Sequence, residues 1–262
     1  MMLNEKAMLV SLNVTEWNPY RTDPKATDDT IKANGAKRGS GRFNKLLVDL
    51  YSVKQYRRAM GDARTFHYAN TLPWSDTGAR ILPSQNYFEY VKAMRQLKAN
   101  WEAAVSEFVR EYPALIAQAE SDLGGLFRRQ DYPRADEVAA KFSFNIQVSP
   151  LPSSDDFRVD LGDDEVKAIQ ADIEARVTAQ VQESVLDLWS RLQNAISHMV
   201  ERLRGSDKIF RDSLVGNINE LTDVLPKLNI TGDPNLAKAI SEAKAGLANL
   251  DPDTLRKNPG AC

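Results

Sequence analysis

Two long stretches of the chain repeat apolar residues every three or four positions, the spacing that aligns side chains on one face of an α-helix. The first stripe consists of Tyr87, Val91, Met94, Leu97, Trp101, Val105, Phe108, Tyr112 and Leu115. The second consists of Val166, Ile169, Ile173, Val177, Val181, Val185, Leu188, Leu192, Ile196, Met199 and Leu203. Both predict helices far longer than the globular average of about 11–12 residues. We expect Pro113 to kink the first helix and Gly124-Gly125 to end it.

The segment between the stripes has the alternating pattern of β-strands. The alternating residues are Phe142, Phe144, Ile146 and Val148. Residues 157–161 alternate again after a polar turn, so we expect a β-hairpin at about 142–161. A short N-terminal strand is expected at Ala7–Val14. The expected fold class is therefore mainly α: an elongated antiparallel long-helix stalk, coiled-coil-like, with a small β-hairpin and a short N-terminal strand.

Turn residues and apolar spacing divide the rest of the chain into shorter elements. The expected shorter helices cover about 27–33, 43–69 and 134–141, with two or three more within 208–250, broken at Pro226 and at 232–234. Thr27-Asp28-Asp29 starts the first of them, and Asp233 before Pro234 is typical of a helix cap. The segment Thr71–Pro83 is rich in Pro, Gly, Ser and Asp, which favours a loop.

These elements suggest three regions. Residues 1–83 form a basic, aromatic-rich N-terminal region, residues 84–204 the long-helix stalk with its hairpin, and residues 205–262 a set of C-terminal short helices with a loose tail. The 262 residues carry a net charge of −2, but the first 70 hold 12 Lys or Arg against 7 Asp or Glu. This excess of basic residues indicates that the N-terminal region contacts a polar partner, although the region is far less basic than a dedicated nucleic-acid-binding module.

Motifs for catalysis or metal binding are missing from the sequence. The one cysteine, Cys262, excludes an internal disulfide, and no HExxH is present. His67 and His198 lie on separate predicted helices. Turn and helix-start chemistry accounts for the carboxylates Asp155, Asp156, Asp160, Asp163 and Asp164. We therefore expect no enzyme, no cofactor and no metal.

The apolar runs are shorter than the ~18–20 residues that a membrane span needs. The first residues are a poor signal peptide, because a lysine and an acidic residue precede only a short apolar run. We expect no membrane span and a cytoplasmic location.

The loop GAKRGSGR is rich in glycine and basic residues. It lacks the GxxxxGK spacing of a P-loop, yet its backbone N–H groups with Lys37, Arg38 and Arg42 suit a phosphate or an acidic partner. A flexible connector with solvated charges is the favoured reading of this loop. Aromatic and basic residues also interleave nearby, a pattern typical of single-stranded nucleic-acid binding. The further candidates for such binding are Arg57, Arg58, Arg64, Trp17 and Trp74.

Two long helices in a stalk leave apolar surface for an oligomer interface, for which Trp101, Phe108 and Trp189 are the candidates. This favours a homo-oligomer. A hairpin between long helices is also similar to the tongue of helical pore-forming proteins. That reading is less favoured, because Asn145 and Gln147 make one face of the hairpin polar.

Several stretches together resemble one family of proteins from bacteria, plasmids and tailed phages, over about residues 7–200. They are WNPYRTDPKATDD, GSGRFNKLLVD, ARTFHYANTLPWSDTGARILPSQNYFEY, VSEFVREYPAL, FSFN and DFRVDL. The family has no assigned activity, so the resemblance implies no catalytic residue. It implies gene neighbours of the MoxR-type AAA ATPase and von Willebrand A-domain kinds.

The expected function is thus a non-enzymatic helical assembly or adaptor protein, phage or plasmid encoded. It would act in the cytoplasm of a bacterial host and self-associate or dock to a partner such as an AAA ATPase. Single-stranded nucleic-acid binding by the N-terminal third is the alternative.

Overall fold

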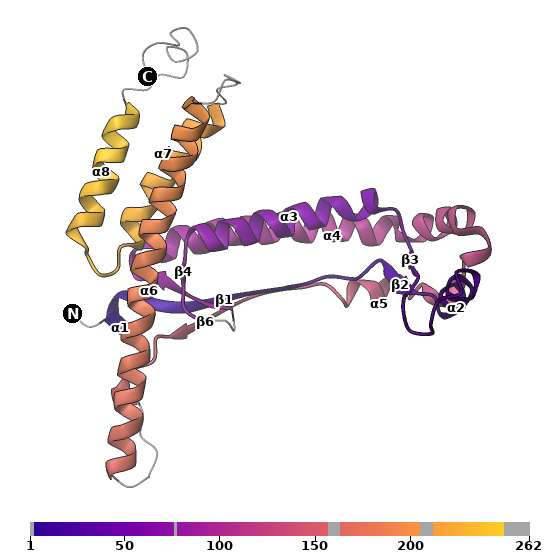
Figure 1. The fold of residues 1–262 in the computed structure, drawn as a ribbon, viewed down its shortest axis with the longest axis horizontal. Coiled ribbons are helices and arrows are strands. Elements are labelled where there is room, and N and C mark those ends of the chain that lie inside the picture. The colour runs from indigo at the N-terminus through magenta and orange to yellow at the C-terminus, as the bar shows by residue number, and fades with distance from the viewer. Residues whose placement is uncertain (1–2, 76–77, 157–162, 205–211, 249–262) are drawn as a thin grey trace. The chain divides into compact units, whose positions relative to one another are not determined.

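The computed structural model describes residues 3–75, 78–156, 163–204 and 212–248, and it is mainly helical with a small antiparallel sheet (Figure 1). The helices are α1 Leu3–Lys6, α2 Pro24–Ala33, α3 Leu50–Ala69, α4 Tyr87–Leu123, α5 Ala135–Ala139, α6 Asp163–Arg204, α7 Asp212–Leu228 and α8 Pro234–Ala248. The strands are β1 Ala7–Thr15, β2 Tyr20–Thr22, β3 Asn44–Leu46, β4 Leu72–Pro73, β5 Ala79–Pro83 and β6 Ser143–Pro150. Short 3-10 helices are η1 Ser84–Asn86, η2 Gly124–Leu126, η3 Arg129–Asp131 and η4 Ser154–Asp156.

The chain forms two compact units, each built from separate segments of sequence. Unit 1 contains residues 1–11, 67–91 and 146–262, and unit 2 contains residues 12–66 and 92–145. Several long elements, including α3 and α4, begin in one unit and continue into the other. Each unit is described by itself below.

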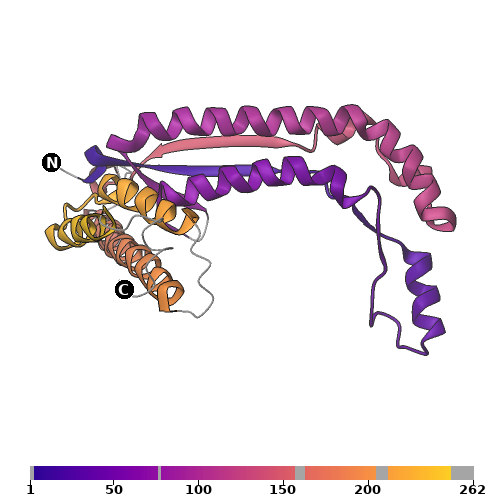
Figure 2. The ribbon, with the colours of Figure 1, turned by 90° about the horizontal axis from the view of Figure 1, so that it is seen from above.

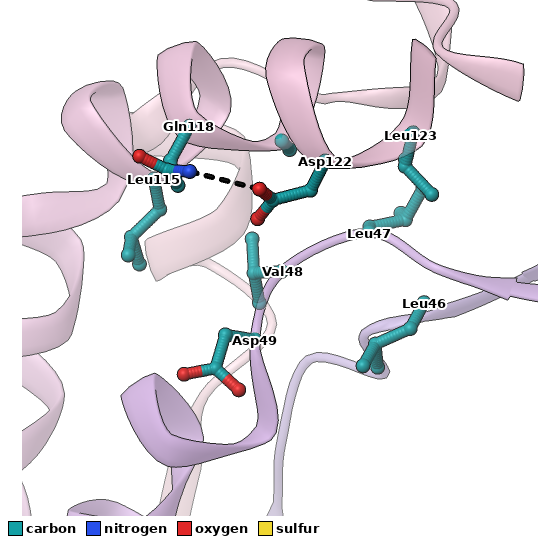
Figure 3. Close-up of a pocket in the computed structure, with 9 residues that line it drawn as sticks. Leu46, Leu47, Val48, Asp49, Leu115, Gln118, Asp122 and Leu123 are labelled. Atoms are coloured by element: carbon teal, nitrogen blue, oxygen red, sulfur yellow. Dashed lines mark hydrogen bonds between the residues drawn. The ribbon is translucent and has the colours of Figure 1, made fainter. Parts of the chain in front are cut away.

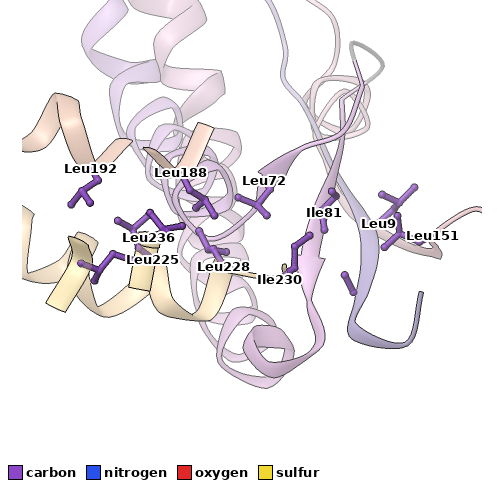
Figure 4. Close-up of a cluster of buried hydrophobic side chains, with 12 residues drawn as sticks. Leu9, Leu72, Ile81, Leu151, Leu188, Leu192, Leu225, Leu228, Ile230 and Leu236 are labelled. Atoms are coloured by element: carbon purple, nitrogen blue, oxygen red, sulfur yellow. The ribbon is translucent and has the colours of Figure 1, made fainter. Parts of the chain in front are cut away.

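Unit 1 packs α6, α7 and α8 beside a small sheet whose strand order is β4-β5-β1-β6. Strand β5 is antiparallel to β1, with Leu9 opposite Ile81, and antiparallel to β4. The core joins residues of α6, α7 and α8 to this sheet (Figure 4). It contains Ala7, Leu9, Leu72, Ile81, Leu151, Leu188, Leu192, Leu225, Leu228, Ile230, Leu236 and Ile240. Burial of so many branched side chains supplies most of the stabilisation that this unit has.

Unit 2 is built around aromatic side chains on α3, α4 and the adjoining strands, which run alongside one another (Figure 2). The Phe108 ring lies 5.8 Å from Trp17 and 5.2 Å from Tyr56, centroid to centroid. The Trp101 ring lies 6.1 Å from Phe142 and 5.6 Å from Phe144. Tilted and edge-on rings at these distances attract one another beyond their area of contact. Trp101 and Phe108 of the α4 stripe are therefore covered by aromatic neighbours within unit 2.

The short two-stranded ribbon of β2 and β3 in unit 2 contains a buried charged residue, Lys45. The Lys45 Nζ atom lies 3.0 Å from Asp23 Oδ2 and 2.6 Å from Asp131 Oδ2. It also donates to the carbonyl oxygen of Leu126 at 2.8 Å. All three residues with charged groups are buried, so this ion cluster ties the ribbon to η2 and η3.

Most of the periodic elements are confirmed. The N-terminal strand is β1, the first stripe is α4 with Pro113 inside it, and Gly124 follows at the helix end with φ of +49°. The second stripe is α6, and the strand expected at 142–150 is β6. Asp233 caps α8 by accepting from the Asn235 N–H at 2.9 Å.

The structure gives no support for the predicted antiparallel stalk of two long helices. Most of α4 belongs to unit 2, whereas α6 belongs to unit 1 and contacts α7, α8, β4 and η4 there. The two stripes therefore do not form one pair: Leu188 and Leu192 of the second are buried in the core of unit 1, whereas Trp101 and Phe108 of the first are buried in unit 2. Strand β6 lies next to β1 in the sheet, and the second strand expected for the hairpin, 157–161, is outside the described residues.

Four local predictions were wrong. The helix expected from residue 43 begins at Leu50, because 44–46 pair with 20–22 as β3 and β2. The expected loop Thr71–Pro83 contains β4 and β5, which a distant strand stabilises. Helix α2 starts at Pro24 rather than Thr27, since Asp23 caps it by accepting from the Ala26 N–H.

The fourth concerns Pro226, which lies within α7 and does not break it. A proline inside a helix costs about 3 kcal/mol. Here Leu225 and Leu228, on either side of it, are both 0% exposed in the core of unit 1, and their burial outweighs that cost.

Candidate interaction surfaces

A groove of about 470 Å³ runs between α6 and α8 in unit 1. Its lining is Trp189, Leu192, Gln193, Ile196, Ser197, Ala239, Glu242 and Ala243, which we name the α6–α8 groove. On the α8 side, Ala239 and Ala243 are four residues apart on one helix face, and their small side chains leave the groove open. Leu192, 3% exposed, belongs to the core below. The groove therefore offers apolar surface directly above the core of unit 1.

Two large apolar side chains extend this surface along α6. Leu186 is 66% exposed and Ile196 is 37% exposed. Together with Trp189 and Gln193 they follow steps of three, four and three residues, so they share one face of the helix. An exposed apolar face of this kind is typical of an interaction site.

The Trp189 ring is held in place by α8's capping residue. Its Nε1 donates to Asp233 Oδ2 at 3.3 Å, while Asp233 Oδ1 accepts from the N–H of Asn235. The same carboxylate thus caps α8 and orients the indole that lines the groove. This preorganises the α6–α8 groove.

A second groove, of about 320 Å³, lies in unit 2 between the β3–α3 connection and the end of α4 (Figure 3). Its lining is Leu46, Leu47, Val48, Asp49, Leu115, Gln118, Ala119, Asp122 and Leu123, which we name the β3–α4 groove. Its floor is apolar, and its charged lining residues, Asp49 and Asp122, are both acidic and exposed. The Asp122 carboxylate accepts from Gln118 Nε2 at 2.8 Å, as the dashed line in Figure 3 marks.

The candidate phosphate-binding cations divide into two groups. Lys37, Arg38 and Arg42 lie exposed in the loop between α2 and β3, and Arg58 is exposed on α3. Arg57 is half-buried and pairs with Glu16 at 3.0 Å, and Arg64 reaches the Val14 carbonyl oxygen at 3.5 Å. The loop cations therefore present the more accessible charge.

The aromatic candidates are mostly interior. Trp17, Trp101 and Phe108 are at most 6% exposed, so none of them offers a face for stacking a base or docking a partner. Trp74 and Trp189 are half-buried in unit 1. Of the predicted interface residues, Trp189 alone lines a groove.

The two histidines have different surroundings. His198 is exposed on α6, whereas His67 is buried and its Nδ1 lies 2.7 Å from the Tyr90 hydroxyl. Burial, with nearby Arg80 adding to it, lowers the pKa of His67 to about 4. A neutral histidine fixed in this way is a packing residue of unit 1.

Arg80 and Arg191 donate hydrogen bonds to carbonyl oxygens at the C-terminal end of α3 and just beyond it. Their Nη2 atoms both donate to the Thr71 carbonyl oxygen, at 3.1 and 2.9 Å, and Arg191 Nη1 donates to the Ala69 carbonyl oxygen at 3.1 Å. The last carbonyls of a helix lack intrahelical partners and carry partial negative charge, which cations offset. These two arginines therefore have a structural role.

In the part of the chain that the structure describes, no three His, Cys, Asp or Glu side chains gather as a metal ion would require. Nor does any described helix contain a segment apolar enough to span a bilayer. No family model, no curated protein and no solved structure matches the chain.

The sequence analysis did not identify Leu186 beside the α6–α8 groove or the acidic pair in the β3–α4 groove. Leu186 falls outside the α6 stripe, because that stripe follows the buried face through Leu188 and Leu192. Its signal is its position three residues before Trp189, on the adjoining face. Asp49 and Asp122 are 73 positions apart, and no local pattern joins them.

Proposed function

We propose that the chain is a non-enzymatic assembly protein that self-associates through the α6–α8 groove. The observation that carries this proposal is the apolar face of α6, where Leu186 and Ile196 stay exposed beside the half-buried Trp189. Removing such a face from water is favourable by roughly 25 cal/mol for each Å² covered.

The occupant we assign to the groove is the same face of a second copy. In a two-fold dimer the same patch serves both copies, so it must be self-complementary. What supports such a contact is that the surface has both kinds of residue it needs: Leu186 and Ile196 are exposed apolar side chains on α6, and Ala239 and Ala243 are small residues on the α8 side of the groove. Apolar side chains entering spaces on a facing helix are the usual basis of helix pairing.

The test is light scattering coupled to size-exclusion chromatography on wild type and on Leu186→Asp/Ile196→Asp. Both positions are exposed, so the double variant retains the fold of unit 1. We expect the wild type to be an oligomer at micromolar concentration and the variant to be a monomer. Asn194→Asp, an exposed α6 position outside the groove, is the matched control and stays oligomeric. A wild type that is monomeric throughout contradicts the proposal.

The resemblance to phage and plasmid proteins adds a cellular location and a partner to this proposal. We propose action in the cytoplasm of a bacterial host and docking of the assembled protein to an AAA ATPase of the MoxR type. Binding of such a purified ATPase to wild type, and its loss in Leu186→Asp/Ile196→Asp, is the expected result. Equal binding to both proteins removes the α6–α8 groove from that contact.

Single-stranded nucleic-acid binding is the second candidate, favoured by the exposed cations Lys37, Arg38, Arg42 and Arg58. Because Trp17 is buried, binding would depend on charge without its stacking. A labelled oligonucleotide then binds in a strongly salt-dependent way and is released by Lys37→Ala/Arg38→Ala/Arg42→Ala. Unchanged affinity of that variant excludes the loop.

A further inference from the structure

We infer that the basic loop of residues 36–42 docks in the β3–α4 groove of a second copy of this chain. This contact involves unit 2 and goes beyond the α6–α8 contact proposed above. The two surfaces carry opposite charges, the groove is large enough for basic side chains, and the loop does not line the groove of its own chain.

The groove carries uncompensated negative charge. Asp49 and Asp122 are its charged residues, both are exposed, and none of the nine lining residues is basic. Gln118 donates to Asp122 at 2.8 Å and supplies no charge. The apolar floor beneath, formed mainly by leucine and valine side chains, lowers the local dielectric and strengthens attraction to a cation.

The loop carries the opposite charge. Lys37, Arg38 and Arg42 are all exposed, and the ion pairs found among the described residues involve none of the three. The loop has a defined turn, in which Ser40 donates to the Lys37 carbonyl oxygen through both its N–H and its hydroxyl. Gly39 adopts φ of +90°, a conformation that side chains disfavour. A shaped loop with three solvated cations is suited to an acidic partner.

The dimensions of the groove match long basic side chains. Lys and Arg bury their methylene stems along apolar surface while their charged ends stay in water. A volume of about 320 Å³ lies at the lower end of the range for ligand sites, which suits one or two such side chains. The stems would lie on Leu47 and Val48, with the charged ends at Asp49 and Asp122.

The loop does not fill the groove of its own chain. Residues 36–42 are absent from the groove lining, although both belong to unit 2. A contact between copies therefore joins two different surfaces, loop to groove. Where each copy's loop enters the other's groove, the pair closes as a two-fold dimer, and where the contact is not reciprocated it builds rings or filaments.

The experiment uses purified full-length chains that all carry Leu186→Asp/Ile196→Asp, so the α6–α8 contact is removed and each inference is tested alone. One copy is immobilised and the other is in solution, and binding is measured by interferometry. Every immobilised copy also carries Lys37→Ala/Arg38→Ala/Arg42→Ala, so that only its groove and the loop of the soluble copy can pair. We expect weak binding that falls at least about 10-fold between about 50 and about 500 mM NaCl, because exposed charges are screened.

Charge exchange then tests the pairing. Asp122→Lys on the immobilised copy, against an unchanged loop, is expected to lower affinity about 10-fold, and Lys37→Glu/Arg38→Glu on the soluble copy, against an unchanged groove, to do the same. Combining the two variants is expected to restore binding. Asp62→Lys, an exposed α3 position outside the groove, is the control and leaves binding unchanged.

Three results would overturn the inference. They are equal binding by Asp122→Lys and its parent, no restoration in the exchanged pair, and loss of oligonucleotide binding by the loop variant while all self-binding persists. The last result would assign the loop to nucleic acid. Melting temperatures of each variant are recorded, so that a misfolded variant is replaced by Asp122→Asn or Arg38→Gln.

Discussion

Lys45 and Asp23 form an ion pair in the interior of unit 2, with 3.0 Å between Nζ and Oδ2, and neither side chain is more than 3% exposed. The ammonium group also donates to the Leu126 carbonyl oxygen and forms a second ion pair with Asp131. Two hydrogen bonds and two opposite charges thus surround the ammonium group, which is what makes a charge tolerable in a protein interior. The Ala26 N–H, followed by Lys45, lowers the pKa of Asp23.

Replacing Lys45 by Met removes the buried cation between two buried carboxylates and leaves Asp131 with Arg21 and Asp23 with the more distant Arg128, both of which are largely exposed arginines. We expect the free energy of unfolding to fall by about 3–5 kcal/mol, the usual effect of breaking a buried pair from one side. Urea denaturation followed by circular dichroism measures it. Lys98→Met, which removes an exposed i,i+4 pair with Glu102, is the control and changes stability by less than about 0.5 kcal/mol. Equal effects from both variants would mean that the cluster is not buried.

His67 makes stability depend on pH. Its pKa is about 4 in the folded chain and about 6.5 when unfolded. Between these values the unfolded chain binds the proton more tightly, so stability falls as pH drops from about 6.5 to about 4, by up to about 3 kcal/mol. His67→Asn removes this slope, while His198→Asn keeps it because His198 is exposed. Parallel pH profiles for wild type and His67→Asn would refute the prediction.

Phe108 belongs to the core, although the sequence suggested an interface. Truncation to alanine is expected to lower stability by about 3–5 kcal/mol, because the cavity sits between Trp17 and Tyr56. Phe88→Ala is a chemically identical control at an 82% exposed position and changes stability by less than about 0.5 kcal/mol. Thermal denaturation at low concentration compares the two. A change of oligomeric state without loss of stability would return Phe108 to the interface.

Asp233 links α8 to the α6–α8 groove. Asp233→Ala removes the helix cap and the partner of Trp189 Nε1. We expect it to lower the free energy of unfolding by about 1–2 kcal/mol. Asp233→Asn keeps a capping oxygen and is expected to lose less than half as much. Chemical denaturation of both variants distinguishes these values. Identical losses would show that the cap geometry, rather than a side-chain oxygen, holds α8.

The sequence predicts elements whose signal is local. The lengths of α4 and α6 follow from many turns of repeated apolar spacing, and a cap such as Asp233 before Pro234 depends on neighbouring residues only. Strand β5 is different, since its five residues follow a glycine and end in a proline. It becomes a strand because β1, some 70 residues earlier, pairs with it.

Which side chains form the surfaces depends on the three-dimensional arrangement even more than the pairing of the strands does. Lys45 reads as an ordinary surface lysine until Asp23 and Asp131 are brought to it by the fold. Trp189 and Phe108 are both aromatic residues predicted at an interface, yet one lines a groove and the other is buried. Periodicity identifies the apolar face of a helix, but it does not show which part of that face the neighbouring elements leave uncovered.

Protection of the α6–α8 groove in the assembled protein is the most direct test of self-association. Ser197→Cys places a thiol in the groove, and Asn194→Cys places one on exposed α6 surface outside it, each combined with Cys262→Ser. Maleimide labelling rates are compared at concentrations above and below assembly. The account predicts that Ser197→Cys labels at least about 10-fold more slowly when concentrated, as burial in a tight contact requires, while Asn194→Cys is unaffected. Equal labelling of Ser197→Cys at every concentration would contradict it.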